Sequence, residues 1–101
     1  MDNHFGGVIW TNHALDRLRE RGIKQGDAWA TWRNPEDSKK GSAQGSWIYY
    51  KTFNSTRIEV VAKQNEKKEW LILSVWSRPV FEKDTSQKNN FWSSLVRFLF
   101  K

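Results

Sequence analysis

The chain has 101 residues, among them seven Trp and six Phe, so one compact domain is expected and there is little room for a second core. It has no cysteine, which excludes a disulfide framework, a thiol nucleophile and any Cys-ligated metal site. Seventeen Lys and Arg against eleven Asp and Glu give a net charge of +6, which favours a polyanionic partner, with nucleic acid as the first candidate.

The first residues, 1–4, lack the basic segment and apolar run of a secretory signal. No stretch approaches the roughly 18 apolar residues that a membrane span needs. We therefore expect a protein that is not integral to a membrane and that works in the cytoplasm.

A first helix is predicted from Thr11 to Arg21, after a short apolar run at 8–10 that is either a brief strand or a packed lead-in. Thr11 or Asn12 can cap its N-terminus. Gly22 suits the left-handed residue that ends a helix. The apolar residues of this segment lie on one helical face: Ala14, Leu15 and Leu18.

A second helix is predicted over residues 25–33, with Asp27 near the positive end of its dipole. Ala28, Trp29 and Trp32 are expected to face inward. Pro35 ends this helix, and the polar segment 36–46 is expected to be a surface loop.

Three strands are predicted next, over residues 46–53, 57–63 and 69–77. The polar connections between them have hairpin length, so the strands should form an antiparallel meander. The last strand is nearly continuous in apolar residues, which favours a central position in the sheet. Two helices packed on this sheet of three to four strands make an α+β domain.

A C-terminal helix is predicted over residues 91–100, where apolar residues recur at helical spacing after a polar run. The chain is therefore divided into a domain at 1–84 and a helical extension at 85–101. We expect the extension to pack on the same domain, and the alternative is a homodimer formed through this helix.

His13, Arg17 and Arg21 follow one another at intervals of four residues, so they form one ribbon along the first helix. Lys51, Arg57 and Arg78 lie in or beside the predicted strands, and the aromatic pair at 49–50 lies next to Lys51. Cations interleaved with aromatic rings suit single-stranded RNA, whose phosphates bind Lys or Arg and whose bases can stack on rings. The alternative is that the arginines only pair with neighbouring acids and that the aromatic residues form core.

No spacing of His, Asp and Glu resembles a metal site, so an enzyme built on this chain is expected to use no metal. RNA permits such chemistry because its own 2′-hydroxyl can attack the adjacent phosphate. The protein then supplies a general acid or base and fixed positive charge, roles open to His13 and to nearby arginines.

The segment Thr11–Ile23 carries the pattern T-x-H-A-x-x-R-x-x-x-R-G-I, and it is followed by a short helix ending in Asn-Pro-Glu at 34–36. Together with Tyr50-Lys51, the segment 57–61 and a final aromatic strand, this resembles domain-of-unknown-function family 4258 over about residues 9–77. That family is similar to the RelE/ParE and BrnT toxins. The resemblance implies a RelE-like fold of sheet and helices, metal-independent RNA cleavage and a cognate antitoxin as partner. Residues 91–101 lie outside the family pattern.

The resemblance implies a set of site residues. Those matching the helix motif and the basic strand positions are expected to be catalytic or to stabilise the reacting phosphate: His13, Arg17, Arg21, Lys51 and Arg57. Further RNA-binding candidates are Arg19, Lys24, Tyr50, Ser74 and Arg78. No metal ligand and no cofactor are expected.

The sequence thus predicts a metal-independent endoribonuclease, the toxin of a toxin–antitoxin pair. One alternative is a nucleic-acid-binding or regulatory module that uses the same basic face without catalysis. Another is an interaction protein that docks a partner through its Trp-rich surface and its last helix.

Overall fold

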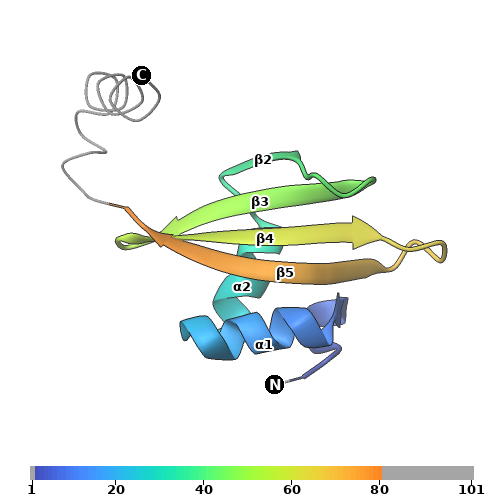
Figure 1. The fold of residues 1–101 in the computed structure, drawn as a ribbon, viewed down its shortest axis with the longest axis horizontal. Helices are drawn as coiled ribbons and strands as arrows, with labels where there is room; N and C mark the ends of the chain where they lie inside the picture. The colour runs from blue at the N-terminus through green and yellow to red at the C-terminus, as the bar shows by residue number, and fades with distance from the viewer. Residues whose placement is uncertain (1, 81–101) are drawn as a thin grey trace.

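A computed structural model describes residues 2–80 of the chain, and they form an α+β domain (Figure 1). The predicted pair of N-terminal helices packed on a sheet is confirmed. The elements in chain order are the 3₁₀ turn η1 (Phe5–Gly7), β1 (Ile9–Trp10), α1 (Asn12–Arg21), α2 (Gln25–Arg33), β2 (Asp37–Lys40), β3 (Ser46–Phe53), β4 (Thr56–Gln64) and β5 (Trp70–Pro79).

The sheet has five strands in the order β1-β5-β4-β3-β2. The antiparallel meander of β3, β4 and β5 is present as predicted. The prediction of a purely antiparallel sheet of three to four strands is wrong, because β1 pairs with β5 in parallel and β2 pairs with β3. The run at 8–10 therefore contributes a strand, which is too short to carry a pattern of its own.

The expected loop at 36–46 contains the edge strand β2, and this is a second correction. Backbone pairing to β3 forms the strand, with Asp37 opposite Tyr50 and Lys40 opposite Trp47. All four side chains of β2 are exposed, so no buried face imposes an alternating pattern on them. Charged residues are common on sheet edges because they discourage further strand pairing.

The central strand is β4, and the prediction that the last strand is central is also wrong. The register between β4 and β5 is shifted beside Val61 and Ala62, a β-bulge that leaves Leu73 unpaired. The apolar run of β5 arises because both its faces have contacts. Ile72 and Val75 are fully buried in the core, whereas Trp76 meets arginines of α1.

Both ends of α1 follow the sequence signals. Thr11 caps the helix, since its Oγ1 accepts a hydrogen bond from the Ala14 backbone N–H at 3.1 Å. The same hydroxyl donates to the Ile72 carbonyl at 3.0 Å, which ties the start of α1 to β5. Gly22 has φ of 64°, and the Ile23 N–H bonds the Leu18 carbonyl at 2.9 Å, the pattern of a glycine-terminated helix.

The core lies on one face of the sheet, between the strands and the two helices. In Figure 1, α2 crosses behind the sheet and α1 lies alongside β5, pointing the same way as that strand. The strands contribute Ile58, Val60, Ala62, Ile72 and Val75, and α1 contributes Ala14, Leu15 and Leu18. The opposite face, which we call the open face, is covered by neither α1 nor α2.

The predicted C-terminal helix at 91–100, and with it the extension 85–101, lies outside the described residues. Homodimer formation through that helix remains a prediction for the same reason. Within residues 2–80, no helix has the length and apolar character needed to cross a membrane.

Candidate nucleic-acid interface

The strand register sorts residues into rows across the open face. One row runs Trp76 on β5, Glu59 on β4, Tyr50 on β3 and Asp37 on β2. The next row contains Arg78 and Arg57 beside Thr52. Because directly paired residues of antiparallel strands share a face, two aromatic rings, two acids and two arginines meet on a small area.

Trp76 receives two guanidinium groups from α1. The Arg21 guanidinium carbon is 3.4 Å from the centre of the Trp76 ring, and that of Arg17 is 5.8 Å away. Both distances are within the range of a cation–π contact. The two arginines reach Trp76 because β1 pairs with β5 only at Leu71 and Ile72, so the edge of β5 beyond them borders α1 directly.

Tyr50 holds a second group of cations. The Arg57 guanidinium carbon is 4.3 Å from its ring centre, and the Lys39 Nζ is 5.7 Å away. The Tyr50 side chain is buried, so it can act on a ligand only through the cations that cover it. The Arg57 Nε is buried without a hydrogen-bond partner among the described residues, which costs about 1–3 kcal/mol. Packing alone would not favour an arginine here.

Glu59 lies between the two rings, on the central strand. Its Oε2 accepts a hydrogen bond from Arg78 Nε at 2.5 Å. The Glu59 side chain is 14% exposed and that of Arg78 is 61% exposed, so the pair joins a largely buried carboxylate to an exposed arginine. The open face therefore places one carboxylate among arginines.

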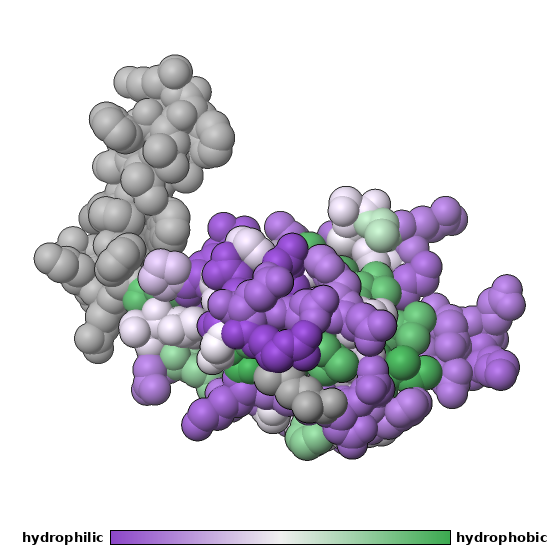
Figure 2. Space-filling model, turned by 60° about the horizontal axis from the view of Figure 1, so that its bottom comes forward, coloured by the Kyte–Doolittle hydropathy of each residue, from purple (hydrophilic) through white to green (hydrophobic). Residues whose placement is uncertain are grey.

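His13 is exposed on α1, one helical turn before Arg17. Since α1 and β5 run side by side in the same direction, the start of α1 lies toward the start of β5 (Figure 1). Ser74 lies in the middle of β5, opposite Val61. Figure 2 brings the α1 side of the molecule forward and shows hydrophilic residues over it, with apolar patches between them. Of the predicted ribbon, His13 and Arg21 are exposed and Arg17 is half-buried, and the two arginines contact Trp76 on the open face.

The predicted site residues do not all come together. Lys51 lies opposite Ile58 on the covered face, where its Nζ donates to the Asn34 carbonyl at the end of α2 at 3.0 Å. Arg19 is exposed and forms an ion pair with Asp16. Arg17 pairs with Glu20, as the alternative expects, but it also contacts Trp76, and none of the ion pairs among residues 2–80 includes Arg21. Lys24 is the N-cap residue of α2 and is in contact with neither ring.

The family model named Domain of unknown function (DUF4258) matches residues 10–77. The chain belongs to the DUF4258 family. Comparison with curated proteins and with solved structures finds no match. The expected kinship with RelE/ParE and BrnT toxins is therefore a prediction, and the site must be interpreted from its own geometry.

Two parts of this DUF4258 site were missed from the sequence. Glu59 was read only as part of a strand motif, although its spacing of two from Arg57 places both on one face. Trp76 lies within the nearly continuous apolar run of the predicted last strand and was not singled out as a site residue, although its spacing of two from Arg78 gives the same signal. The contact of Trp76 with α1 had no local signal, because it depends on how the helix lies against β5.

Proposed function

We propose that this protein binds single-stranded RNA on its open face and cleaves it without a metal ion. The observation that carries the proposal is the row of Trp76, Glu59 and Tyr50, in which each ring contacts two cations and the carboxylate lies between the rings. A net charge of +6 adds long-range attraction for a polyanion.

Binding is assigned to Arg17, Arg21 and Arg57. A guanidinium that stacks on a ring keeps its N–H donors in its own plane, where they can bond phosphate oxygens, although in the free protein one Arg17 donor bonds Glu20. The ring also restricts the rotamers of a long side chain, so less entropy is lost when the phosphate binds. Trp76 and Tyr50 are separated by one strand, or about 10 Å, so their cations can contact different phosphates of one RNA chain.

Catalysis is assigned to Glu59 and His13. A phosphate held by the arginines on Trp76 lies between α1, which carries His13, and β4, which carries Glu59. In the proposed reaction, the Glu59 carboxylate takes the proton of the ribose 2′-hydroxyl, and the 2′-oxygen forms a bond to phosphorus. The bond from phosphorus to the 5′-oxygen breaks, and the His13 imidazolium gives that oxygen its proton. The products carry a 2′,3′-cyclic phosphate and a 5′-hydroxyl.

The test is incubation of the full chain with a single-stranded RNA and with the DNA of the same sequence, both in EDTA. We expect cleavage of the RNA alone, with 2′,3′-cyclic phosphate ends. Glu59→Gln should cleave much more slowly and still bind. Binding without cleavage by the wild type would identify a non-catalytic RNA-binding module instead. Cleavage that is lost in EDTA and restored by magnesium would contradict the mechanism.

We also propose, from the resemblance to RelE-like families, that the cleavage serves a toxin whose partner is an antitoxin protein. Induced expression of the wild type in a bacterial host should then stop growth, and Glu59→Gln should not. Equal growth arrest by both variants would separate toxicity from the proposed chemistry.

A further inference from the structure

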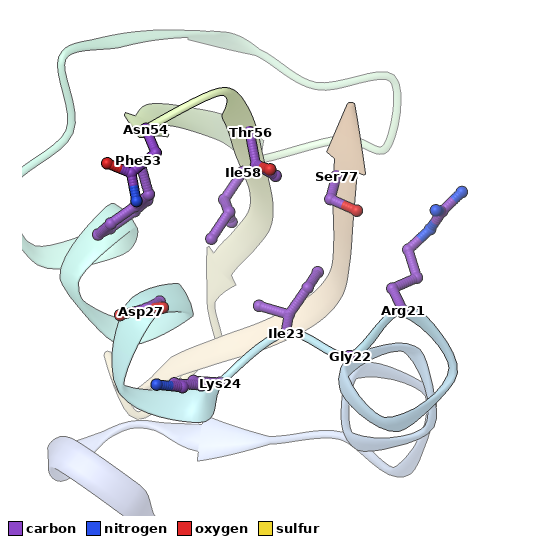
Figure 3. Close-up of a pocket in the computed structure, with 10 residues that line it drawn as sticks. All are labelled: Arg21, Gly22, Ile23, Lys24, Asp27, Phe53, Asn54, Thr56, Ile58 and Ser77. Carbon is purple, nitrogen blue, oxygen red and sulfur yellow. The ribbon is translucent and has the colours of Figure 1, made fainter. Parts of the chain in front are cut away.

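Apart from the open face, a cavity lies at the end of the domain, between the α1–α2 turn and the β3–β4 turn (Figure 3). We call it the turn cavity, and its volume is about 350 Å³. This is near the lower end of the range of about 300–1,000 Å³ for small-molecule sites, so it suits one small ring system. Its lining is Arg21, Gly22, Ile23, Lys24, Asp27, Phe53, Asn54, Thr56, Ile58 and Ser77.

The turn cavity is adjacent to the open face through Arg21. This residue lines the cavity, and its guanidinium also lies on Trp76. In Figure 3 the Arg21 side chain points away from the cavity, beside the end of β5 that carries Ser77. A nucleotide whose phosphate binds Arg21 therefore has a cavity beside that phosphate.

The lining combines an apolar wall with charged groups at one side. Ile23, Phe53 and Ile58 can contact the face of a flat ring. Lys24 and Asp27 come from the start of α2, and none of the ion pairs among residues 2–80 includes either of them. The cavity thus offers a cationic donor and an anionic acceptor, neither of them engaged in an ion pair.

We propose that the turn cavity binds a guanine base of the RNA, at the nucleotide whose phosphate contacts Arg21. Guanine presents two adjacent N–H donors, N1 and N2, next to the O6 acceptor. A carboxylate can accept from both donors, and an ammonium group can donate to O6. Adenine, cytosine and uracil lack a pair of adjacent donors. This inference rests on the proposed function, and it adds base preference to it.

The test is an NMR titration of the ¹⁵N-labelled full chain with the four ribonucleoside 5′-monophosphates. We expect GMP to shift the signals of backbone amides that line the cavity, including those of Gly22 and Asn54. The dissociation constant for GMP should be at least tenfold lower than that for CMP. Asp27→Asn should remove the preference for GMP while the spectrum remains that of a folded domain. Asp16→Asn, an exposed acid of α1 paired with Arg19, is the matched control and should keep the preference.

Two further results are informative. If all four nucleotides bind equally and shift only residues near Trp76, the cavity is not a base site, and phosphate binding at the open face still stands. If an RNA oligomer containing guanine binds no more tightly than one without it, with an unchanged salt dependence, the inference is likewise overturned. Failure of the proposed function is separate, since it would appear as loss of RNA binding or cleavage by the wild type.

Discussion

Alternate residues of β3, β4 and β5 point to opposite faces of the sheet, and the two faces differ in what they contact. On the covered face, Val60 and Ile72 are completely buried against the helices and neighbouring strands. On the open face, Tyr50 and Trp76 contact cations, and Glu59 is joined to Arg78. Burial of apolar side chains accounts for the residues of the covered face. It does not account for the cations of the open face.

This difference indicates that the covered face provides stability and the open face provides function. Substitutions on the covered face should change the free energy of unfolding, because they leave cavities in a close-packed core. Substitutions of the partly exposed residues of the open face, such as Trp76 and Arg78, should change RNA binding or cleavage and have small effects on stability. Four variants examine that separation, in order of decreasing expected effect.

Glu59→Gln keeps the size of the side chain and removes its capacity to accept a proton. We expect the rate of RNA cleavage to fall by about 10²–10⁴-fold, the usual contribution of a general base. The RNA dissociation constant should stay the same or decrease, since a negative charge is removed from a basic face. Single-turnover cleavage and binding assays measure the two quantities separately, and a variant that cleaves at the wild-type rate would exclude this role.

Ile72→Ala removes a fully buried side chain of the covered face. We expect the free energy of unfolding to fall by about 2–5 kcal/mol, as measured by urea denaturation. RNA affinity of the molecules that remain folded should be unchanged, because Ile72 has no contact with the open face. A loss of affinity without a loss of stability would contradict the separation of the two faces.

Trp76→Leu removes the ring that holds Arg17 and Arg21 but leaves both charges in place. We expect RNA affinity to fall by about tenfold, because without the ring the two arginine side chains lose about 0.5–1.5 kcal/mol each in rotamer entropy when RNA binds. Trp47→Leu is the matched control, since Trp47 and Trp76 are both 38% exposed and Trp47 lies on the covered face. Equal losses in the two variants would show that tryptophan surface alone matters.

Tyr49→Phe should have the smallest effect, a change in how the free energy of unfolding depends on pH in the alkaline range. Burial raises the pKa of the Tyr49 phenol above its usual value of 10.0, so the folded state holds this proton more tightly than the unfolded state does. The resulting stability is fully present below pH 10 and is lost as the pH rises through the folded-state pKa. Urea denaturation at pH 9 and above should show a steeper loss for the wild type than for Tyr49→Phe.

Much of the fold follows from local sequence signals. Thr11, Gly22 and Pro35 set the helix ends, and the alternation of Ile58, Val60 and Ala62 defines the covered face of β4. The edge strand β2 could not be predicted in the same way, because its exposed side chains carry no pattern and only backbone pairing with β3 forms it. The parallel pairing of β1 depends on residues about 60 positions away, Leu71 and Ile72.

The site could be predicted only in part. The spacing of His13, Arg17 and Arg21 places them on one ribbon, and the structure brings two of them to Trp76. Lys51 and Arg57 look equivalent as basic strand residues, yet they lie on opposite faces. Their separation depends on the register between β3 and β4, which the hairpin turn at Asn54 and Ser55 sets in the folded chain.

That pair offers the most direct test of the central claim, which is that RNA binds the open face of the sheet. The measurement is the affinity of a single-stranded RNA oligomer as a function of salt concentration, for the wild type, Arg57→Gln and Lys51→Gln. We predict that Arg57→Gln lowers the number of phosphate contacts by about one, seen as a shallower salt dependence, and that Lys51→Gln leaves the slope unchanged. An unchanged slope for Arg57→Gln together with a shallower one for Lys51→Gln would contradict the account.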